Sequence, residues 1–170
     1  MNALVAQLPG LRRYAAALVG NAAQADDLVQ DSIERALRQS SQLRELDKLP
    51  GWLRRILYNK YMDELRRDRS RGRQQDITES ANDQELSIPA YDGTAMRDFI
   101  KAINALSAEH RQILLLVGLE DLSYQEISDE LGIPLGTVMS RLARARERLR
   151  TMIQEGTSAG TQPPAAKEEP

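Results

Sequence analysis

Arginine side chains gather near the carboxyl end of the chain, where residues 134–152 contain five of them and a single acidic residue, Glu147. A guanidinium group can donate two parallel hydrogen bonds to a guanine edge, or bind a DNA phosphate. If the segment is helical, one arc carries the polar side chains of Thr137, Ser140, Arg141, Arg144 and Arg148. The adjacent arc carries the apolar side chains of Val138, Leu142, Ala145 and Leu149. The pattern predicts a helix that packs on a core with one side and enters a DNA major groove with the other.

The residues before this helix have the pattern of a helix-turn-helix. Ser123 and Glu126 are spaced as a capping box, in which each side chain satisfies the backbone amide of the other residue. A short apolar helix follows, and Gly132 suits the left-handed conformation that ends many helices. A short helix, a three-residue turn and a long basic helix are typical of DNA-binding motifs. The alternative, an amphipathic arginine-rich helix in an ordinary bundle, is disfavoured by the capping box, the glycine turn and the sorted basic face taken together.

A second group of polar side chains lies on a helix that we expect from Gly51 to Arg69. Its members share one side of that helix and are Trp52, Arg55, Asn59, Asp63 and Arg66. An aromatic ring beside amide and guanidinium groups can stack on unpaired bases and hydrogen-bond to them. Residues 52–73 are also basic, with eight basic and three acidic side chains. Trp52 taken alone is better explained as a core residue at the start of a helix.

The preceding helix, expected from Ala22 to Gln39, carries an acidic and polar stripe. The stripe consists of Asp27, Gln30, Asp31 and Glu34. Such a stripe is usually an ordinary solvated surface, but opposite a basic partner it can be a docking site. From the residues alone, both interpretations stay open.

These side chains need helices to position them, and the sequence predicts an all-α fold of two small helical domains joined by a flexible acidic linker. Apolar residues recur at helical spacing, and no segment alternates convincingly as a strand does. Further helices are expected from Leu11 to Val19, near Met96, and from Ala108 to Leu119. Three segments are expected to be irregular: a polar loop over 40–50, the linker over 74–95 and a disordered tail over 153–170.

The composition argues against several classes of function. The 170 residues include no cysteine and one histidine, which argues against disulfides, thiolate or histidine-pair metal sites and Ser–His–Asp chemistry. We therefore expect no cofactor, no metal and no enzymatic activity. The longest apolar run, Ile113–Val117, is far shorter than the roughly 20 residues of a membrane span. The first residues lack the pattern of a secretion signal, so we expect a cytoplasmic protein without membrane insertion.

Three motifs, in this order, resemble bacterial sigma factors of the sigma-70 family, in the short extracytoplasmic-function (ECF) class. They are residues 26–31 (DDLVQD), 52–67 (WLRRILYNKYMDELRR) and 135–146 (LGTVMSRLARAR). The resemblance covers roughly residues 8–152. It implies a sigma-two domain over 1–73 and a sigma-four domain over 96–152, with no catalytic activity in either.

The resemblance also implies partners. RNA polymerase core would be bound through the clamp helices of its largest subunit and the flap of its second subunit. The stripe of Asp27, Gln30, Asp31 and Glu34 would dock on the clamp helices. The 40–50 loop and the polar face from Trp52 to Arg66 would bind the melted minus-ten element of promoter DNA. The helix from Leu135 would read the minus-thirty-five element, and an anti-sigma factor is an expected further partner.

Two other functions are compatible with parts of the sequence. A stand-alone helix-turn-helix regulator would need only the carboxy-terminal motif. It would not explain the face around Trp52 and Asn59. A mimic that sequesters an antagonist of sigma factors would be free to lose the face around Arg141 and Arg144, which this chain retains. The amino-terminal and carboxy-terminal faces together favour the sigma factor.

Overall fold

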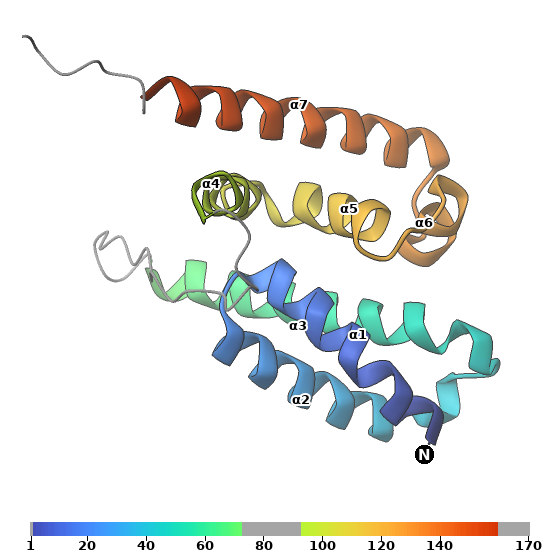
Figure 1. Cartoon of the computed structure of the whole chain (residues 1–170). Helices are drawn as coiled ribbons and strands as arrows, with labels where there is room; N and C mark the ends of the chain where they lie inside the picture. Colours follow the sequence, from blue (N-terminus) through green and yellow to red (C-terminus); the bar gives the residue numbers. More distant parts are fainter. Residues whose placement is uncertain (1, 73–92, 160–170) are drawn as a thin grey trace, which may run out of the picture.

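The computed structural model describes residues 2–72 and 93–159, and these form helices joined by short turns. Three helices make up an amino-terminal unit: α1 (Asn2–Val19), α2 (Ala22–Arg38) and α3 (Leu49–Gly72). Four helices make up a carboxy-terminal unit: α4 (Gly93–Asn104), α5 (Ala108–Gly118), α6 (Tyr124–Leu131) and α7 (Leu135–Ala159). Within the described residues there is no strand, which confirms the predicted all-α fold (Figure 1).

The amino-terminal unit is a three-helix bundle. Its fully buried side chains come from all three helices and are Tyr14, Leu18, Leu28, Leu53 and Leu57. Gly20 turns the chain between α1 and α2 with a φ of +79°. The Asn21 side chain then caps α2 by accepting a hydrogen bond of 3.0 Å from the backbone amide of Gln24.

The first helix is longer than the sequence predicted, because α1 begins at Asn2 and not at Leu11. Leu4 and Leu8 are partly buried and lie one turn apart. They extend toward the amino terminus the inward face that begins, in the predicted helix, with Leu11 and Tyr14. This apolar face is enough to carry the helix through Pro9, which lies on the exposed side. Proline destabilises a helix interior, so the packing of this face overrides a local preference.

The carboxy-terminal unit is organised around α5, which packs against α6 and along α7. Ile113 and Leu116 of α5 are buried together with Ile127 of α6 and Val138 of α7. Ser107 caps α5 by accepting a hydrogen bond from the backbone amide of His110.

Two segments expected to be irregular contain helical structure. The 40–50 loop includes two short 3-10 helices, Ser40–Gln42 and Leu46–Lys48, and α3 then starts at Leu49. At the other end, α7 extends to Ala159, so the prediction of disorder is wrong for residues 153–159. Met152 and Ile153 are partly buried, and α7 packs against α4, which explains the added turns. Most of the predicted linker, residues 74–92, lies outside the described residues, as does the tail from 160 to 170.

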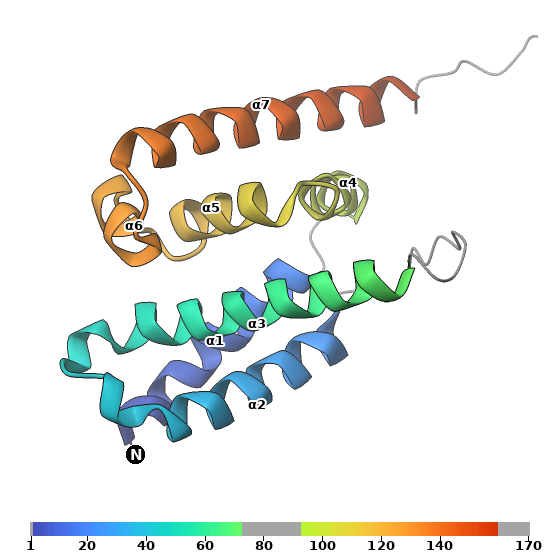
Figure 2. The ribbon, with the colours of Figure 1, turned by 180° about the vertical axis from the view of Figure 1, so that it is seen from behind.

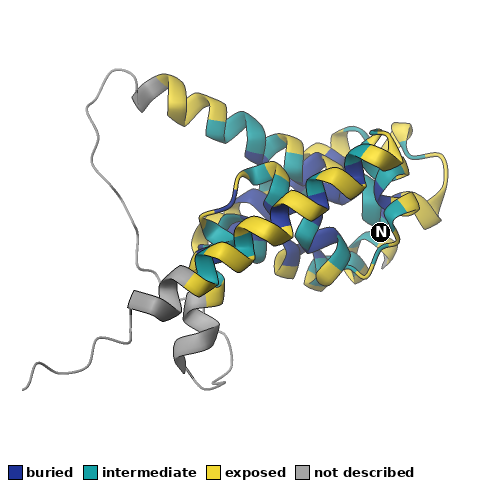
Figure 3. Cartoon of the chain, turned by 90° about the horizontal axis from the view of Figure 1, so that it is seen from above, coloured by how far each residue is buried: buried dark blue, intermediate teal, exposed yellow. Residues whose placement is uncertain are grey.

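The two units pack directly against each other. Helices α4 and α5 lie between the amino-terminal unit and α7 (Figures 1 and 2). Contacts between the units run from α1 to α5 and from α3 to α6, and the buried apolar side chains form one cluster that crosses the boundary. Seen from above, the buried residues gather where the helices of the two units cross (Figure 3). The sequence predicts two small helical domains, and in this arrangement their buried side chains form one continuous core.

Candidate nucleic-acid interface

The helix-turn-helix is formed by α6, Gly132 and α7. In its capping box, the backbone amide of Ser123 donates to Glu126 Oε2 at 2.8 Å, and the backbone amide of Glu126 donates to Ser123 Oγ at 3.2 Å. Hydrogen bonds from the Ser123 side chain and backbone hold the pKa of Glu126 below its ordinary value. Gly132 adopts a φ of +65°, and Ser128 Oγ donates to the Ile133 carbonyl across the turn at 2.6 Å. The motif predicted from the sequence is present in the structure.

The apolar arc of α7 packs as predicted, since Val138, Leu142 and Ala145 are buried. On the polar arc, Ser140, Arg144 and Arg148 are exposed, and Thr137 is partly buried. These four side chains can therefore face a DNA groove without rearrangement of the unit.

Arg141 differs from its neighbours on the polar arc. Its guanidinium lies 3.3 Å from Glu109 of α5, and its side chain is only 32% exposed. It faces the amino-terminal unit, in the groove described below. A base contact by Arg141 thus requires that it leave Glu109, whereas Arg144 is already free of that contact.

Two exposed apolar side chains at the start of α7 were missed in the sequence. Leu135 is 40% exposed and Met139 is 53% exposed. The first turns of a recognition helix approach the base edges, and apolar side chains there can contact a thymine methyl group. The signal was available in the sequence, because Met139 lies outside the apolar arc that faces the core.

The polar face predicted on α3 is present, with Arg55, Asn59 and Arg66 exposed and Asp63 partly buried. Arg66 Nη1 donates to Asp63 Oδ1 at 3.0 Å, so these two side chains orient each other. Trp52 is partly buried and packs against the core, which accounts for it as a core residue at the helix start. Its stacking on bases stays a prediction.

The face of α3 opens onto a groove between the two units, with a volume of about 470 Å³. From the amino-terminal unit, its lining includes Arg55, Tyr58, Asn59, Asp63 and Arg66. From the carboxy-terminal unit, its lining includes Glu109, Gln112, Glu130, Ile133 and Arg141. Burial raises the pKa of Tyr58 to about 12, and the negative charge of Glu109 is the second cause of this increase. Residues expected to contact two different promoter elements thus share one groove.

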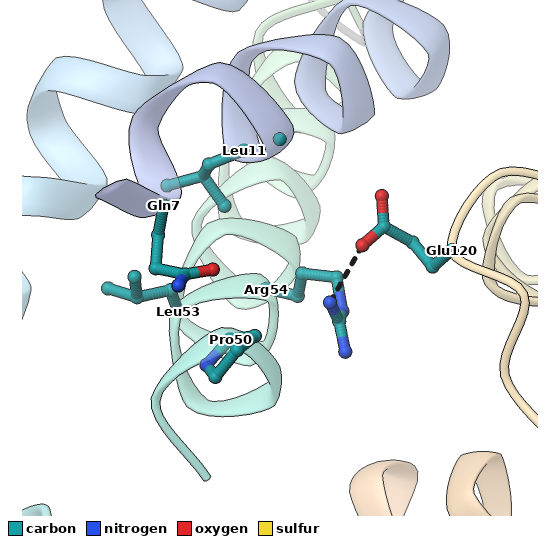
Figure 4. A pocket seen from close by; sticks show the side chains of 7 residues that line it. Gln7, Leu11, Pro50, Leu53, Arg54 and Glu120 are labelled. Carbon is teal, nitrogen blue, oxygen red and sulfur yellow. Dashed lines mark hydrogen bonds and ion pairs between the residues drawn. The ribbon is translucent and has the colours of Figure 1, made fainter. Parts of the chain in front are cut away.

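A buried charged cluster next to this groove joins α3 to the carboxy-terminal unit. Arg54 Nε and Nη2 donate to the two carboxylate oxygens of Glu130 at 3.0 and 2.6 Å, and Nη1 donates to Glu120 Oε2 at 2.8 Å. All three side chains are at most 13% exposed. We call these residues the Arg54 cluster; Figure 4 shows Arg54 and Glu120 facing each other beside a cavity of about 30 Å³.

The charge of Arg54 is well compensated in this cluster. Burial disfavours the guanidinium charge, but the hydrogen bond and charge of Glu130 and the charge of Glu120 outweigh it. The pKa of Arg54 therefore lies above its ordinary value. These partners could not be inferred from local spacing, because they lie 66 and 76 residues away from Arg54 along the chain.

Arg111 of α5 makes the reverse connection, from the carboxy-terminal unit to the amino-terminal unit. It donates to the Leu18 carbonyl at the end of α1, and its Nη1 lies 3.5 Å from the Tyr61 hydroxyl of α3. Within its own unit it donates to the carbonyls of Ile103 at 3.1 Å and Leu106 at 3.2 Å. Burial lowers the pKa of Arg111, and contact with Tyr61 offsets part of this effect.

The acidic stripe lies on the outer surface of α2. Asp27, Gln30 and Glu34 are exposed, and Gln30 Nε2 approaches Glu34 Oε1 at 3.5 Å. Asp31 is partly buried and forms an ion pair with Lys60 of α3. Three of the four side chains are therefore available to a partner, and the fourth also ties α2 to α3.

Two further kinds of feature are absent from residues 2–72 and 93–159. No group of three or more potential ligands there could hold a metal ion. No helix in this part of the chain is long and apolar enough to cross a membrane.

Family comparisons match both units. A family model described as "Sigma-70, region 4" matches residues 96–149, and a model described as "Sigma2 domain of PhyR" matches residues 4–58. The chain is 30% identical over 154 residues to the ECF RNA polymerase sigma factor EcfG of Rhodopseudomonas palustris, covering 88% of this chain and 82% of EcfG. It is 36% identical over 155 residues to the ECF sigma factor SigE of Mycolicibacterium smegmatis, covering 88% of this chain and 60% of SigE.

Two solved structures share the fold. The sigma factor RpoE of Bartonella quintana, solved in complex with the anti-sigma factor NepR, is 32% identical with a TM-score of 0.71, over 89% of this chain and 94% of RpoE. The PhyRSL–NepR complex of Sphingomonas sp. Fr1 aligns with a TM-score of 0.61 at 19% identity, over 99% of this chain and 95% of that one. At that identity the second likeness shows the fold alone.

Proposed function

This chain belongs to the ECF sigma factors of the sigma-70 family, and we propose that it binds RNA polymerase core through α2 and guides it to promoters through α3 and α7. The observation that carries the proposal is the exposed polar arc of α7, in a chain that also presents an exposed acidic stripe on α2. A regulator that worked alone would need only the first of these surfaces.

Each surface has a specific role in the proposal. Asp27, Gln30, Asp31 and Glu34 dock on the clamp helices of the largest polymerase subunit, and the carboxy-terminal unit contacts the flap of the second subunit. Arg55, Asn59, Asp63 and Arg66, with Trp52 at the edge, bind the melted minus-ten element. Thr137, Ser140, Arg141, Arg144 and Arg148 read the minus-thirty-five element in the major groove. The chain itself has no catalytic activity in this scheme and works in the cytoplasm, where the polymerase is.

An anti-sigma factor is a further partner in the proposal. RpoE, which is similar to this chain over most of its length, was solved in complex with the anti-sigma factor NepR. The groove between the two units offers such a partner simultaneous contact with α3 and α7. A protein bound there would cover Asn59 and Arg141 together.

Run-off transcription tests the function directly. Purified chain and RNA polymerase core are incubated with a library of promoter fragments, and the transcripts are sequenced. We expect transcripts from a subset of promoters with shared minus-thirty-five and minus-ten sequences, and none from core alone. An Arg144→Ala variant serves as the matched control, since it should still bind core but lose the shared minus-thirty-five sequence.

A sigma mimic is the second candidate function, favoured by the match of residues 4–58 to a model named for PhyR. A mimic would bind an anti-sigma factor but would produce no transcript with core polymerase. The same run-off experiment therefore separates the two candidates.

A further inference from the structure

We propose that Met139 reads the 5-methyl group of a thymine in the minus-thirty-five element, which makes it a specificity-determining residue of α7. The proposal rests on the proposed function and adds to it the chemical group that is recognised. Three observations carry it: the position of Met139 on the helix, its exposure together with Leu135, and the basic side chains around it.

Met139 lies on the part of α7 that can enter a groove. The side of α7 that faces the core is defined by its buried side chains, which are Val138, Leu142 and Ala145. At about 3.6 residues per turn, Ser140 points almost directly away from that side, and the exposed Met139 and Arg144 flank it. Helix α7 also runs along the outside of the carboxy-terminal unit, with α4 and α5 between it and the amino-terminal unit (Figures 1 and 2). Met139 can therefore reach DNA without rearrangement of the unit.

Met139 and Leu135 form a short apolar strip on this exposed side. Met139 is 53% exposed, and Leu135, one turn before it, is 40% exposed. A single exposed apolar side chain is common on proteins. This strip, however, occupies the first turns of the second helix of a helix-turn-helix, which are the turns that approach base edges. The apolar group that a base pair presents in the major groove is the C5 methyl of thymine, and contact with the strip would remove both from water.

The basic side chains around the strip favour DNA over a protein as its occupant. Exposed Arg144 lies on one side of Met139, and exposed Arg146 and Arg150 continue the other side, seven and eleven residues further along the helix. Residues 134–152 contain five arginines and one acidic residue. An apolar segment of a protein partner would leave these charges uncompensated. The major groove at a thymine supplies both a methyl group and the phosphates on either side of it.

Gly136 permits the close approach that this contact requires. It precedes Met139 and Ser140 by one turn on the same exposed side. A Cβ atom at Gly136 would meet no atom within 4 Å, and its backbone is not left-handed, so the fold itself does not require glycine there. Alanine is the more favourable residue in a helix. A bare backbone at this position lets α7 lie deeper in the groove, which brings Met139 nearer to the base edges.

Replacing thymine by deoxyuridine tests the contact directly, because the two bases differ only by the 5-methyl group. The probe is a promoter recovered by run-off transcription with the full chain and core polymerase. Each thymine of its minus-thirty-five element, on either strand, is replaced in turn. We expect the holoenzyme to bind about fourfold more weakly at one position, the effect of removing one methyl group from an apolar contact. The other replacements should have little effect.

Variants at position 139 assign this effect to the side chain. In Met139→Ala, thymine and deoxyuridine at the sensitive position should be bound equally, because neither base then has an apolar partner. Met139→Leu should retain most of the preference for thymine, since it keeps an apolar side chain of similar size. Val5→Ala is the matched control: it removes an equally exposed apolar side chain, on α1, and should retain the whole preference.

Gly136→Ala tests the close approach separately. We expect it to weaken binding of the holoenzyme to the unmodified promoter and to reduce the response to deoxyuridine, because the added methyl group lifts α7 away from the bases. Thermal unfolding of the full chain should show no loss of stability, since the Cβ meets no atom and alanine favours the helix. Unchanged promoter binding by this variant would contradict the close approach.

The response at the sensitive position decides the outcome. If no deoxyuridine replacement weakens binding, or if Met139→Ala responds as the parent does, Met139 does not read a methyl group and the proposal is overturned. A minus-thirty-five element without thymine on either strand overturns it as well. If Met139→Ala instead weakens binding to core polymerase in the absence of DNA, the strip belongs to a protein interface and the proposal is again wrong. All of these results leave promoter-directed transcription intact, whereas failure of the proposed function would appear as the absence of any promoter-directed transcript.

Discussion

Arg54 and Arg111 cross the same interface in opposite directions and end on different kinds of acceptor. Arg54 reaches from α3 to two carboxylates, whereas Arg111 reaches from α5 to backbone carbonyls and the Tyr61 hydroxyl. The first contact neutralises a charge, and the second orders the ends of α1 and α4 around one side chain. The two contacts should therefore respond differently to mutation.

Arg111→Lys should destabilise the whole chain. A lysine carries one nitrogen and cannot reach the carbonyls of Leu18, Ile103 and Leu106 together, so several buried carbonyls lose their donor. We expect a loss of about 1.5–3 kcal/mol in the free energy of unfolding, from hydrogen bonds to a charged donor. Urea unfolding followed by circular dichroism measures it. Exposed Arg146→Lys is the control, and an equal effect of the two changes would contradict the assigned role of Arg111.

The polymerase-docking prediction concerns the exposed acids of α2. Asp27→Lys/Glu34→Lys should weaken binding to core polymerase about tenfold or more, because like charges would then oppose each other at the interface. Asp31 is left unchanged because it pairs with Lys60. Asp26→Lys is an equivalent charge reversal on the same helix outside the stripe. It removes only an exposed ion pair with Arg12, which contributes little, so it should have little effect. Titration of labelled chain with core at moderate salt gives the affinities; if the double variant binds as tightly as Asp26→Lys, the docking surface lies elsewhere.

The melting prediction concerns Asn59. Its exposed amide on α3 can hydrogen-bond to unpaired bases, so Asn59→Ala should slow open-complex formation on duplex promoters. The loss should be smaller on a promoter with a pre-melted bubble, where the bases are already separated. Permanganate footprinting over time measures both templates. Equal losses on the two templates would show that Asn59 has a structural role instead.

Base reading and phosphate binding should separate on α7. Arg144→Ala should flatten the preference for the minus-thirty-five sequence by roughly 1–3 kcal/mol, as expected for a bidentate contact to guanine. Arg150, which pairs with Glu147 on the far side of α7, should affect all sequences alike and reduce the salt slope by about one unit. Binding of the full chain to specific and scrambled duplexes, across a salt series, checks both. Loss of specificity in Arg150→Ala alone would falsify the assignment of the reading face.

Gly132→Ala should destabilise the carboxy-terminal unit. The added Cβ meets no atom within 4 Å, so the cost arises from the left-handed backbone at φ +65° and should be about 1–2 kcal/mol. Gly118→Ala, also without a close neighbour, should be neutral or slightly stabilising. Thermal unfolding compares the two, and a stable Gly132→Ala variant would mean that this turn can adopt another conformation.

Local signals in the sequence predicted the local structure well. The capping box at Ser123, the left-handed turn at Gly132 and the buried arc of α7 were all predicted correctly, because each depends on residues within one or two helical turns. The early start of α1 was missed because the interpretation of the sequence relied on such local signals. Pro9 is a strong local signal against a helix, and only packing against α2 and α3 overrides it.

The relation between the two units could not be predicted from the sequence. Arg54 and Arg55 are adjacent basic residues, yet the first is buried against Glu120 and Glu130 and the second is exposed on the groove. Nothing in their local spacing distinguishes their partners. Likewise, Arg141 fell on the expected DNA-facing arc, but its contact with Glu109 depends on how α5 packs beside α7.

The contact between Arg111 and the Leu18 carbonyl places different constraints on the two helices during evolution. Every residue type offers a carbonyl, so substitutions at position 18 can alter packing but cannot remove the acceptor. All of the side-chain specificity of this contact resides on α5. Side chains along the end of α1 could therefore change, within the limits set by core packing, and the connection would remain. Pairwise co-variation between α1 and α5 would not reveal this contact.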